Sequence, residues 1–171
     1  MLLRLVALMA YWLADLLKNK QISFFFVASI GWVGDSSVYH IRDGKVLYHT
    51  KDHSYVNYLI SIGEITPEEA KDHPKKNVVM RVVHGNGTHS RMDTKEITDI
   101  FPNDFFMLVS DGVWDVIDDK DIAQWFVRST SVEKVEKLIK AKCKDLSNDN
   151  YSCVLVKIGE ESVWKKMKKL I

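Results

Sequence analysis

A stretch of alternating apolar and polar residues, 38–48, restricts the folds open to this chain more than any other feature. Its sequence is V-Y-H-I-R-D-G-K-V-L-Y, with Asp43 and Gly44 at the centre. Alternation with a period of two is typical of half-buried strands, and Asp-Gly favours a two-residue hairpin turn with positive φ at both positions. The stretch therefore predicts two antiparallel strands, and we interpret Asp43 as a turn former rather than a metal ligand.

Three further apolar runs predict additional strands. Residues 22–33 are rich in Phe, Val and Ile, and residues 105–110 form the continuous apolar run F-F-M-L-V-S. An uninterrupted run of this length is typical of a strand that is covered on both faces. The polar turn S-N-D-N then leads into a last predicted strand, Y-S-C-V-L-V-K-I-G, at residues 151–159.

Capping signals predict helices between these strands. Residues 54–63 end at a glycine, and Thr66-Pro67-Glu68-Glu69 combines an N-cap residue, a proline at the first helical position and a capping-box glutamate. Two longer helices are predicted at residues 118–128 and 130–144, the second with a capping box from Thr130 to Glu133. Residues 84–94 are polar and contain two glycines, so we expect a loop there.

The N-terminal segment is strongly apolar. Its polar residues are spaced so that they would share one face of a helix, and Asp15 interrupts the run before it reaches the roughly 20 residues of a bilayer span. We therefore expect a hydrophobic helix over residues 1–20 that is mostly buried. A membrane anchor and an interface for a partner chain remain as alternatives for this segment.

Composition excludes several classes of protein. A chain of 171 residues favours one domain, and a net charge of +1 gives no reason to expect nucleic acid as a partner. The only cysteines, Cys143 and Cys153, cannot build a disulfide framework or a four-cysteine zinc site, which favours a cytoplasmic location. The lysine-rich residues 159–171 are interpreted as a solvated basic tail.

Three aspartates lie beside predicted strand ends, each next to a small or turn-forming residue. They are Asp35 in V-G-D-S, Asp111 in V-S-D-G and Asp149 in S-N-D-N. Strand ends hold carboxylates rigidly, and carboxylate oxygens favour Mg²⁺ or Mn²⁺ over zinc. Ordinary turns use the same residue types, so spacing alone leaves both a shared metal site and simple turn formation open.

The order of motifs over residues 27–158 resembles that of the protein phosphatase 2C family of metal-dependent Ser/Thr phosphatases, especially its bacterial branch. The resemblance rests on a hairpin motif, a flap region at about residues 51–80 with the strand after it, and two C-terminal metal-site motifs. The corresponding sequences are V-G-D-S-S-V-Y-H-I-R-D-G-K, T-K-D-H-S-Y-V-N-Y-L-I-S-I-G-E-I-T-P-E-E-A-K-D-H-P-K-K-N-V-V-M-R, L-V-S-D-G-V-W-D-V-I and D-N-Y-S-C-V-L-V.

The resemblance implies an α+β fold of two packed antiparallel β-sheets flanked by helices, with residues 22–158 as the phosphatase-like domain. It implies hydrolysis of phosphoserine and phosphothreonine in proteins by a water that two or three Mn²⁺ or Mg²⁺ ions activate. Asp111 and Asp149 would be ligands of the core metals, and Asp35 would serve an additional metal together with Asp111. Gly34, Gly112 and Asn150 would support these positions.

The sequence also departs from the family pattern. A phosphate-binding Arg, an acidic pair and a D-G-x-G-G motif normally precede the hairpin motif. Here the only acidic residue before Asp35 is Asp15, no D-G-x-G-G occurs, and Ser37 stands where the family has an Arg. We therefore expect an N-terminally truncated form of the domain with weakened metal binding, and we assign no catalytic side chain.

The departures leave two rival hypotheses open. The chain is either part of a phosphatase that acts on phosphorylated Ser/Thr proteins, or a non-catalytic binding module or fragment that needs self-association or a partner chain through exposed strand edges. The six histidines show no zinc-type pairing and are expected to be structural, and Arg81 is interpreted as a fold-supporting ion-pair residue with cleft exposure as the alternative.

Overall fold

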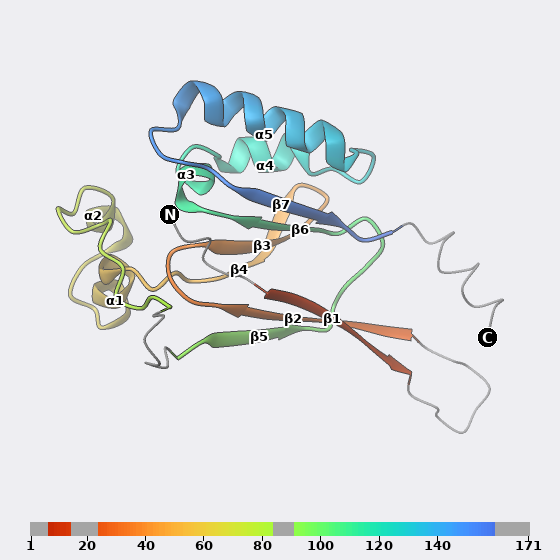
Figure 1. Ribbon diagram of the computed structural model, residues 1–171, viewed down its shortest axis with the longest axis horizontal. Helices are drawn as coiled ribbons and strands as arrows, with labels where there is room; N and C mark the ends of the chain where they lie inside the picture. The colour runs from red at the N-terminus through yellow and green to blue at the C-terminus, as the bar shows by residue number, and fades with distance from the viewer. Residues whose placement is uncertain (1–6, 15–23, 84–90, 160–171) are drawn as a thin grey trace.

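A computed structural model describes residues 7–14, 24–83 and 91–159, with side chains from residue 27 onward. Two antiparallel sheets lie one above the other (Figure 1). The three-stranded sheet has the order β1-β2-β5, formed by β1 (Ala7–Ala14), β2 (Phe24–Trp32) and β5 (Asp93–Ile97). The four-stranded sheet has the order β4-β3-β6-β7, formed by β4 (Lys45–His49), β3 (Ser37–Arg42), β6 (Phe105–Val109) and β7 (Cys153–Lys157).

Helices flank the sheets at two places. Figure 1 shows α4 (Asp119–Trp125) and α5 (Val132–Leu146) over the outer face of the four-stranded sheet. The short helices α1 (Tyr55–Ser61) and α2 (Pro67–Lys71) stand beside one end of the sheets, and α3 (Asp111–Trp114) follows β6 directly. This arrangement confirms the expected α+β class with two packed antiparallel sheets.

The N-terminal segment differs from the expectation. Residues 7–14 form β1, which pairs antiparallel with β2 from Ala7 opposite Gly31 to Ala14 opposite Phe24, so a helix over residues 1–20 is wrong for this part. An apolar run without alternation cannot distinguish a buried strand from a buried helix, and pairing with β2 is what satisfies its backbone. Residues 1–6 and 15–20 of the predicted helix lie outside the described residues, as do residues 160–171 of the predicted tail.

The predicted hairpin is confirmed. β3 and β4 pair antiparallel with a register shift after His40, and the turn residues Asp43 and Gly44 have φ values of 45° and 74°. A Cβ atom at Gly44 would lie 2.6 Å from the backbone oxygen of Ala123. Glycine is therefore required here both by the positive φ and by the close approach of α4.

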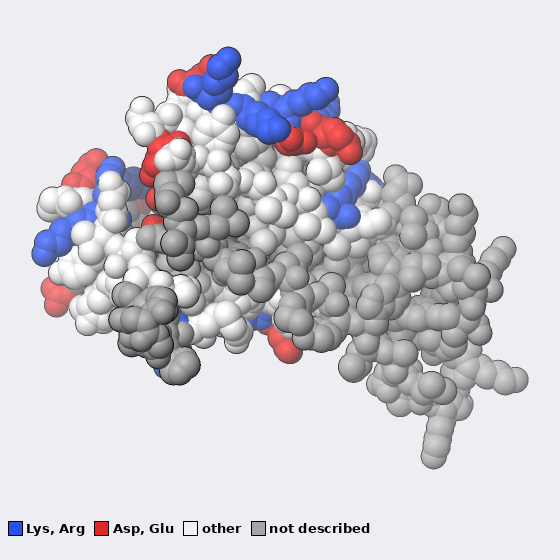
Figure 2. All heavy atoms as spheres, in the orientation of Figure 1, with Lys and Arg blue, Asp and Glu red and all other residues white. Residues whose placement is uncertain are grey.

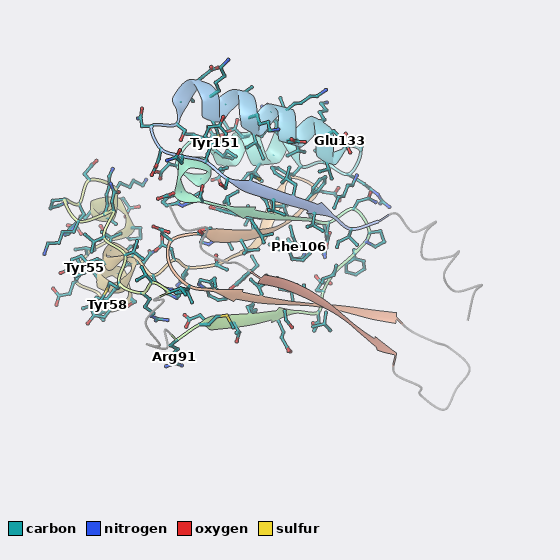
Figure 3. All side chains as sticks on the ribbon, viewed as in Figure 1. Tyr55, Tyr58, Arg91, Phe106, Glu133 and Tyr151 are labelled. Carbon is teal, nitrogen blue, oxygen red and sulfur yellow. The ribbon has the colours of Figure 1, made fainter. Side chains whose placement is uncertain are left out.

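Two apolar clusters hold the layers together. One lies between the four-stranded sheet and the helices and contains Phe105, Phe126, Val135 and Ile139. The other, between the two sheets, contains Ile30, Trp32, Val38 and Phe106 among others, and Figure 3 shows Phe106 in this position. Burial of each large side chain stabilises the fold by about 1.5–3 kcal/mol, so these clusters fix how the sheets are stacked.

The capping signals are largely confirmed. The Ser54 side chain accepts from Asn57 N–H at the start of α1, and Thr66 and Glu69 form a complete capping box on α2. The start of α5 differs by one residue, because Ser131 and not Thr130 is the N-cap. The predicted polar loop also ends earlier than residue 94, since β5 begins at Asp93. Within the described ranges, no helix has the length and apolar character needed to cross a membrane.

Candidate functional site

The strand register places Asp35 and Asp111 at one end of the four-stranded sheet. Ser37, the first residue of β3, lies opposite Val109, the last residue of β6. Asp35 comes two residues before Ser37 and Asp111 two residues after Val109, so both lie just beyond this end of the sheet. Val109 also lies opposite Cys153, the first residue of β7, and the turn that holds Asp149 precedes this strand at the same end. We call this the aspartate end, defined by Asp35, Asp111 and Asp149.

Backbone contacts hold the second and third aspartates in neighbouring turns. The amide of Ser110 donates to the carbonyl of Ser152, and the amide of Ser152 donates to Ser110 Oγ, each at 3.0 Å. A Cβ atom at Gly112 would lie only 2.7 Å from the carbonyl oxygen of Asn150. Glycine at position 112 is therefore needed for the turn before β7 to approach the start of α3 this closely.

Each of these carboxylates is oriented by the amide that follows it. Gly112 N–H donates to Asp111 Oδ1 at 3.0 Å, and Asn150 N–H donates to Asp149 Oδ1 at 2.6 Å. The hydroxyl of Ser147 donates to the carbonyl of Asp149 at 3.2 Å and so closes the turn. These local bonds come from short-range turn geometry, which is why the S-D-G and N-D-N patterns can be read from the sequence.

A further acidic residue, Asp115, lies at this end and is not among the residues predicted from the motifs. Partial desolvation of its carboxylate and the negative charges of Asp111 and Asp149 raise its pKa, while Lys76 of the flap lowers it. Asp115 is four residues after Asp111 on the same helical turn, and this spacing is the signal that could have identified it. The aspartate end therefore accumulates negative charge.

The loop that carries Asp35 is fixed by the first residues of the flap. Gly34 has a φ of 98° between β2 and β3, a value that favours glycine. Its carbonyl accepts from His53 N–H at 2.8 Å, and its own amide donates to His53 Nδ1 at 3.0 Å. Figure 3 shows Tyr55 and Tyr58 of α1 on the side of the molecule where Tyr151 precedes β7, so the flap stands at the aspartate end.

The side chains at the aspartate end are of the type that binds hard divalent cations. Carboxylate oxygens are the ligands that Mg²⁺ and Mn²⁺ prefer. The pKa of Asp115 is raised first by desolvation and then by the charges of Asp111 and Asp149, which a bound cation would offset. Within the part of the chain that the structure describes, however, no three His, Cys, Asp or Glu side chains form a metal-binding group. The roles of Asp35, Asp111 and Asp149 as metal ligands stay a prediction.

The structure assigns Arg81 to the ion pair expected from the sequence. Arg81 Nη1 lies 2.8 Å from Asp93 Oδ1. Burial opposes ionisation of Asp93, but hydrogen bonds from Arg81 and His53 outweigh it and lower the pKa of the carboxyl. His40 also has a structural contact, since its Nε2 lies 2.8 Å from the fully buried Asp104.

Curated relatives of the chain are bacterial Ser/Thr phosphatases. The chain is 31% identical over 126 residues to the serine/threonine protein phosphatase PstP of Mycobacterium tuberculosis. This alignment covers 74% of this chain and 24% of PstP. It is 31% identical over 130 residues to the protein phosphatase PhpP of Streptococcus pneumoniae, with 75% of this chain and 52% of PhpP covered. The chain thus spans about half the length of PhpP and about a quarter of PstP. No family model matches the chain.

Solved phosphatase structures share the fold. A bacterial serine phosphatase superposes with a TM-score of 0.69 at 29% identity, covering 82% of this chain and 60% of that one. The catalytic domain of PstP in complex with two manganese ions superposes with a TM-score of 0.56, covering 79% of this chain and 59% of that one. Its identity of 24% supports the fold alone.

Proposed function

Because this chain belongs to the protein phosphatase 2C family of Ser/Thr phosphatases, we propose that it is part of an enzyme that hydrolyses phosphoserine and phosphothreonine in proteins through a metal-activated water. The observation that carries the proposal is the register that brings Asp35 and Asp111 to the sheet end where Asp149 precedes β7. These three positions match the family's metal-site motifs in chain order.

In the proposed site, Asp111 and Asp149 hold the core ions, and Asp35 serves an additional ion together with Asp111. Bound Mn²⁺ or Mg²⁺ would supply acidified water near neutral pH and neutralise charge on the phosphoryl oxygens. The amides of Gly112 and Asn150 orient the two core carboxylates, each by one hydrogen bond. Gly34 supports the loop of Asp35 through its bonds to His53.

We further propose that the chain on its own is a weak phosphatase. Three aspartates are few ligands for two or three ions, and the sequence contains no D-G-x-G-G motif. Electrostatic stabilisation is usually the largest contribution to catalysis, and one missing donor costs about 10²–10³ in rate. A non-catalytic phosphatase-like binding module is the second candidate, and the same shortage of ligands favours it.

The open sheet edges favour a partner chain or a second copy. β7 is an edge strand of the four-stranded sheet, and Val154 on it is 58% exposed. In Figure 2, charged side chains gather over α5 and around α1 and α2, whereas the described surface between them is mostly uncharged. Among the described residues no further strand pairs with the outer edge of β7, and uncharged surface beside an open edge invites pairing. We therefore propose association through such edges in a cytoplasmic protein.

The direct test of the proposed activity is a phosphatase assay of the purified chain. It uses p-nitrophenyl phosphate and a phosphothreonine peptide with Mn²⁺, and Asp149→Ala as the matched inactive variant. Slow hydrolysis that requires Mn²⁺ and is lost in Asp149→Ala supports the phosphatase. Hydrolysis that is unchanged in Asp149→Ala contradicts the site, and no hydrolysis combined with phosphopeptide binding favours the binding module.

A further inference from the structure

A buried histidine outside the aspartate set connects the flap to the loop of Asp35. His53 is 7% exposed and makes two hydrogen bonds with Gly34. Its backbone amide donates to the Gly34 carbonyl at 2.8 Å, and its ring nitrogen Nδ1 accepts from the Gly34 amide at 3.0 Å. His53 therefore pairs with both the N–H and the carbonyl of Gly34, the residue immediately before Asp35.

The bond to Gly34 also determines where the ring carries its proton. A backbone N–H is always a donor, so Nδ1 must be the unprotonated nitrogen, and the ring proton is on Nε2. Nε2 lies 3.2 Å from Asp93 Oδ2 and donates to it. Arg81 Nη1 lies 3.2 Å from the same ring nitrogen and donates to Asp93 Oδ1 at 2.8 Å, so Asp93 bridges the two donors.

The ring is further restrained by its surroundings. It stacks on Trp32 with centroids 6.4 Å apart and planes at 12°. Trp32 in turn donates through Nε1 to the carbonyl of Lys51 at 2.8 Å, two residues before His53. At the other end of the flap region (about residues 51–80), Met80 N–H donates to the His53 carbonyl at 2.8 Å, so His53 is held by residues from both ends of the flap.

We propose that His53 is a positioning residue that holds the Asp35 loop against the base of the flap, with Asp93 and Arg81 fixing the ring. The part of this inference that concerns metal rests on the proposed function, in which Asp35 is a ligand. Residues that do not bind a metal themselves but orient its ligands affect the metal affinity. Their loss typically weakens metal binding about 10–100-fold. His53 thereby couples the position of the flap to the position of Asp35.

Two isosteric substitutions separate this role from general packing. In His53→Asn, the amide oxygen can occupy the position of Nδ1 and accept from Gly34 N–H, whereas in His53→Gln the polar atoms reach only the position of Nε2. His73→Gln is the matched control, because His73 Nδ1 also accepts a backbone amide, that of Lys75 at 3.1 Å, within the flap. Circular dichroism and thermal unfolding confirm that each variant is folded.

The first readout is hydrogen exchange of the Gly34 amide, followed by NMR. We expect His53→Gln to accelerate this exchange about five- to tenfold, the factor that one net hydrogen bond provides. His53→Asn and His73→Gln should leave the rate close to that of the wild type. A ring ¹⁵N spectrum of the wild-type chain should show the proton on Nε2, which requires no variant, and a proton on Nδ1 would overturn the inference.

The second readout is Mn²⁺ binding measured by electron paramagnetic resonance. His53→Gln should weaken binding about tenfold, His53→Asn should restore most of it, and neither should add to the loss in Asp35→Asn. If the wild type binds no Mn²⁺, the proposed function fails, and the exchange of the Gly34 amide still decides the role of His53. Equal exchange and equal binding in His53→Gln and His53→Asn would contradict the positioning role.

Discussion

The two ends of the four-stranded sheet differ in what surrounds their acidic side chains. At the end opposite the aspartate end, Asp104 is fully buried and accepts hydrogen bonds from Arg42 Nε at 2.7 Å and Arg42 Nη2 at 2.9 Å. It also accepts from His40 at 2.8 Å and from Phe101 N–H at 2.9 Å. We call this the ion-pair end, defined by His40, Arg42 and Asp104.

The pKa values of Asp104 and Asp115 are shifted in opposite directions. Burial opposes ionisation of Asp104, but the bonds from Arg42, His40 and Phe101 outweigh it and lower its pKa to about 2. At the aspartate end, desolvation and the carboxylates of Asp111 and Asp149 raise the pKa of Asp115. Hydrogen bonds within the fold therefore outweigh the cost of burial at the ion-pair end, whereas at the aspartate end desolvation and neighbouring carboxylates outweigh the opposing effect of Lys76 on Asp115.

The largest effect is expected from removing the compensated charge. Asp104→Ala leaves Arg42 and His40 without their buried acceptor, and breaking a buried pair from one side costs about 3 kcal/mol. Chemical denaturation measures this loss of unfolding free energy. Asp99→Ala is the matched control, because Asp99 pairs with the same Arg42 at 3.1 Å but has a side chain 68% exposed, and it should change stability little. Equal losses in both variants would contradict a special role for burial.

The second expected effect is a loss of unfolding free energy at low pH. Because the folded-state pKa of Asp104 is lowered from 3.8 to about 2, its contribution is present above pH 3.8 and is lost as the pH falls through about 2. Denaturation series between pH 2 and 5 should show a steeper loss in the wild type than in Asp104→Asn. Parallel curves for the two proteins would show that Asp104 does not carry this linkage.

The opposite sign is expected at the aspartate end. A carboxyl with a raised folded-state pKa destabilises the fold at pH values where it is ionised, so Asp115→Asn should increase stability slightly near pH 7 in the absence of divalent ions. The gain should be small because Asp115 is exposed, and it should vanish at low pH. Thermal unfolding at pH 7 and pH 3 in chelator measures both, and a loss of stability at pH 7 would contradict the excess of charge.

Local patterns predicted more of the fold than of the charge network. The Asp43-Gly44 turn, the caps at Ser54 and Thr66 and the apolar strand at 105–110 depend on neighbouring residues and appear where the sequence placed them. The strand at 7–14 was missed because its identity is decided by pairing with β2, which no local pattern contains.

The same limit explains the ion-pair end. His40 and Asp104 are separated by 64 residues and meet only because β3 pairs with β6. In the sequence, Asp104 follows Pro102 and Asn103 and looks like an ordinary turn residue. The positions of Asp111 and Asp149 could be predicted from the sequence because their turns have recognisable short patterns. The hydrogen bonds between His53 and Gly34 could not, because they depend on how the flap packs against the loop of Asp35.

We propose that the aspartate end binds a hard divalent cation weakly. Titration calorimetry with Mn²⁺ on the wild-type chain and on Asp111→Asn tests it most directly, with Asp99→Asn as the control at the ion-pair end. We expect a dissociation constant of about 10⁻³ M, at the weak end of carboxylate sites. Binding should be abolished in Asp111→Asn and unchanged in Asp99→Asn. Heats that are identical in wild type and Asp111→Asn, or no binding in any of the three proteins, would contradict it.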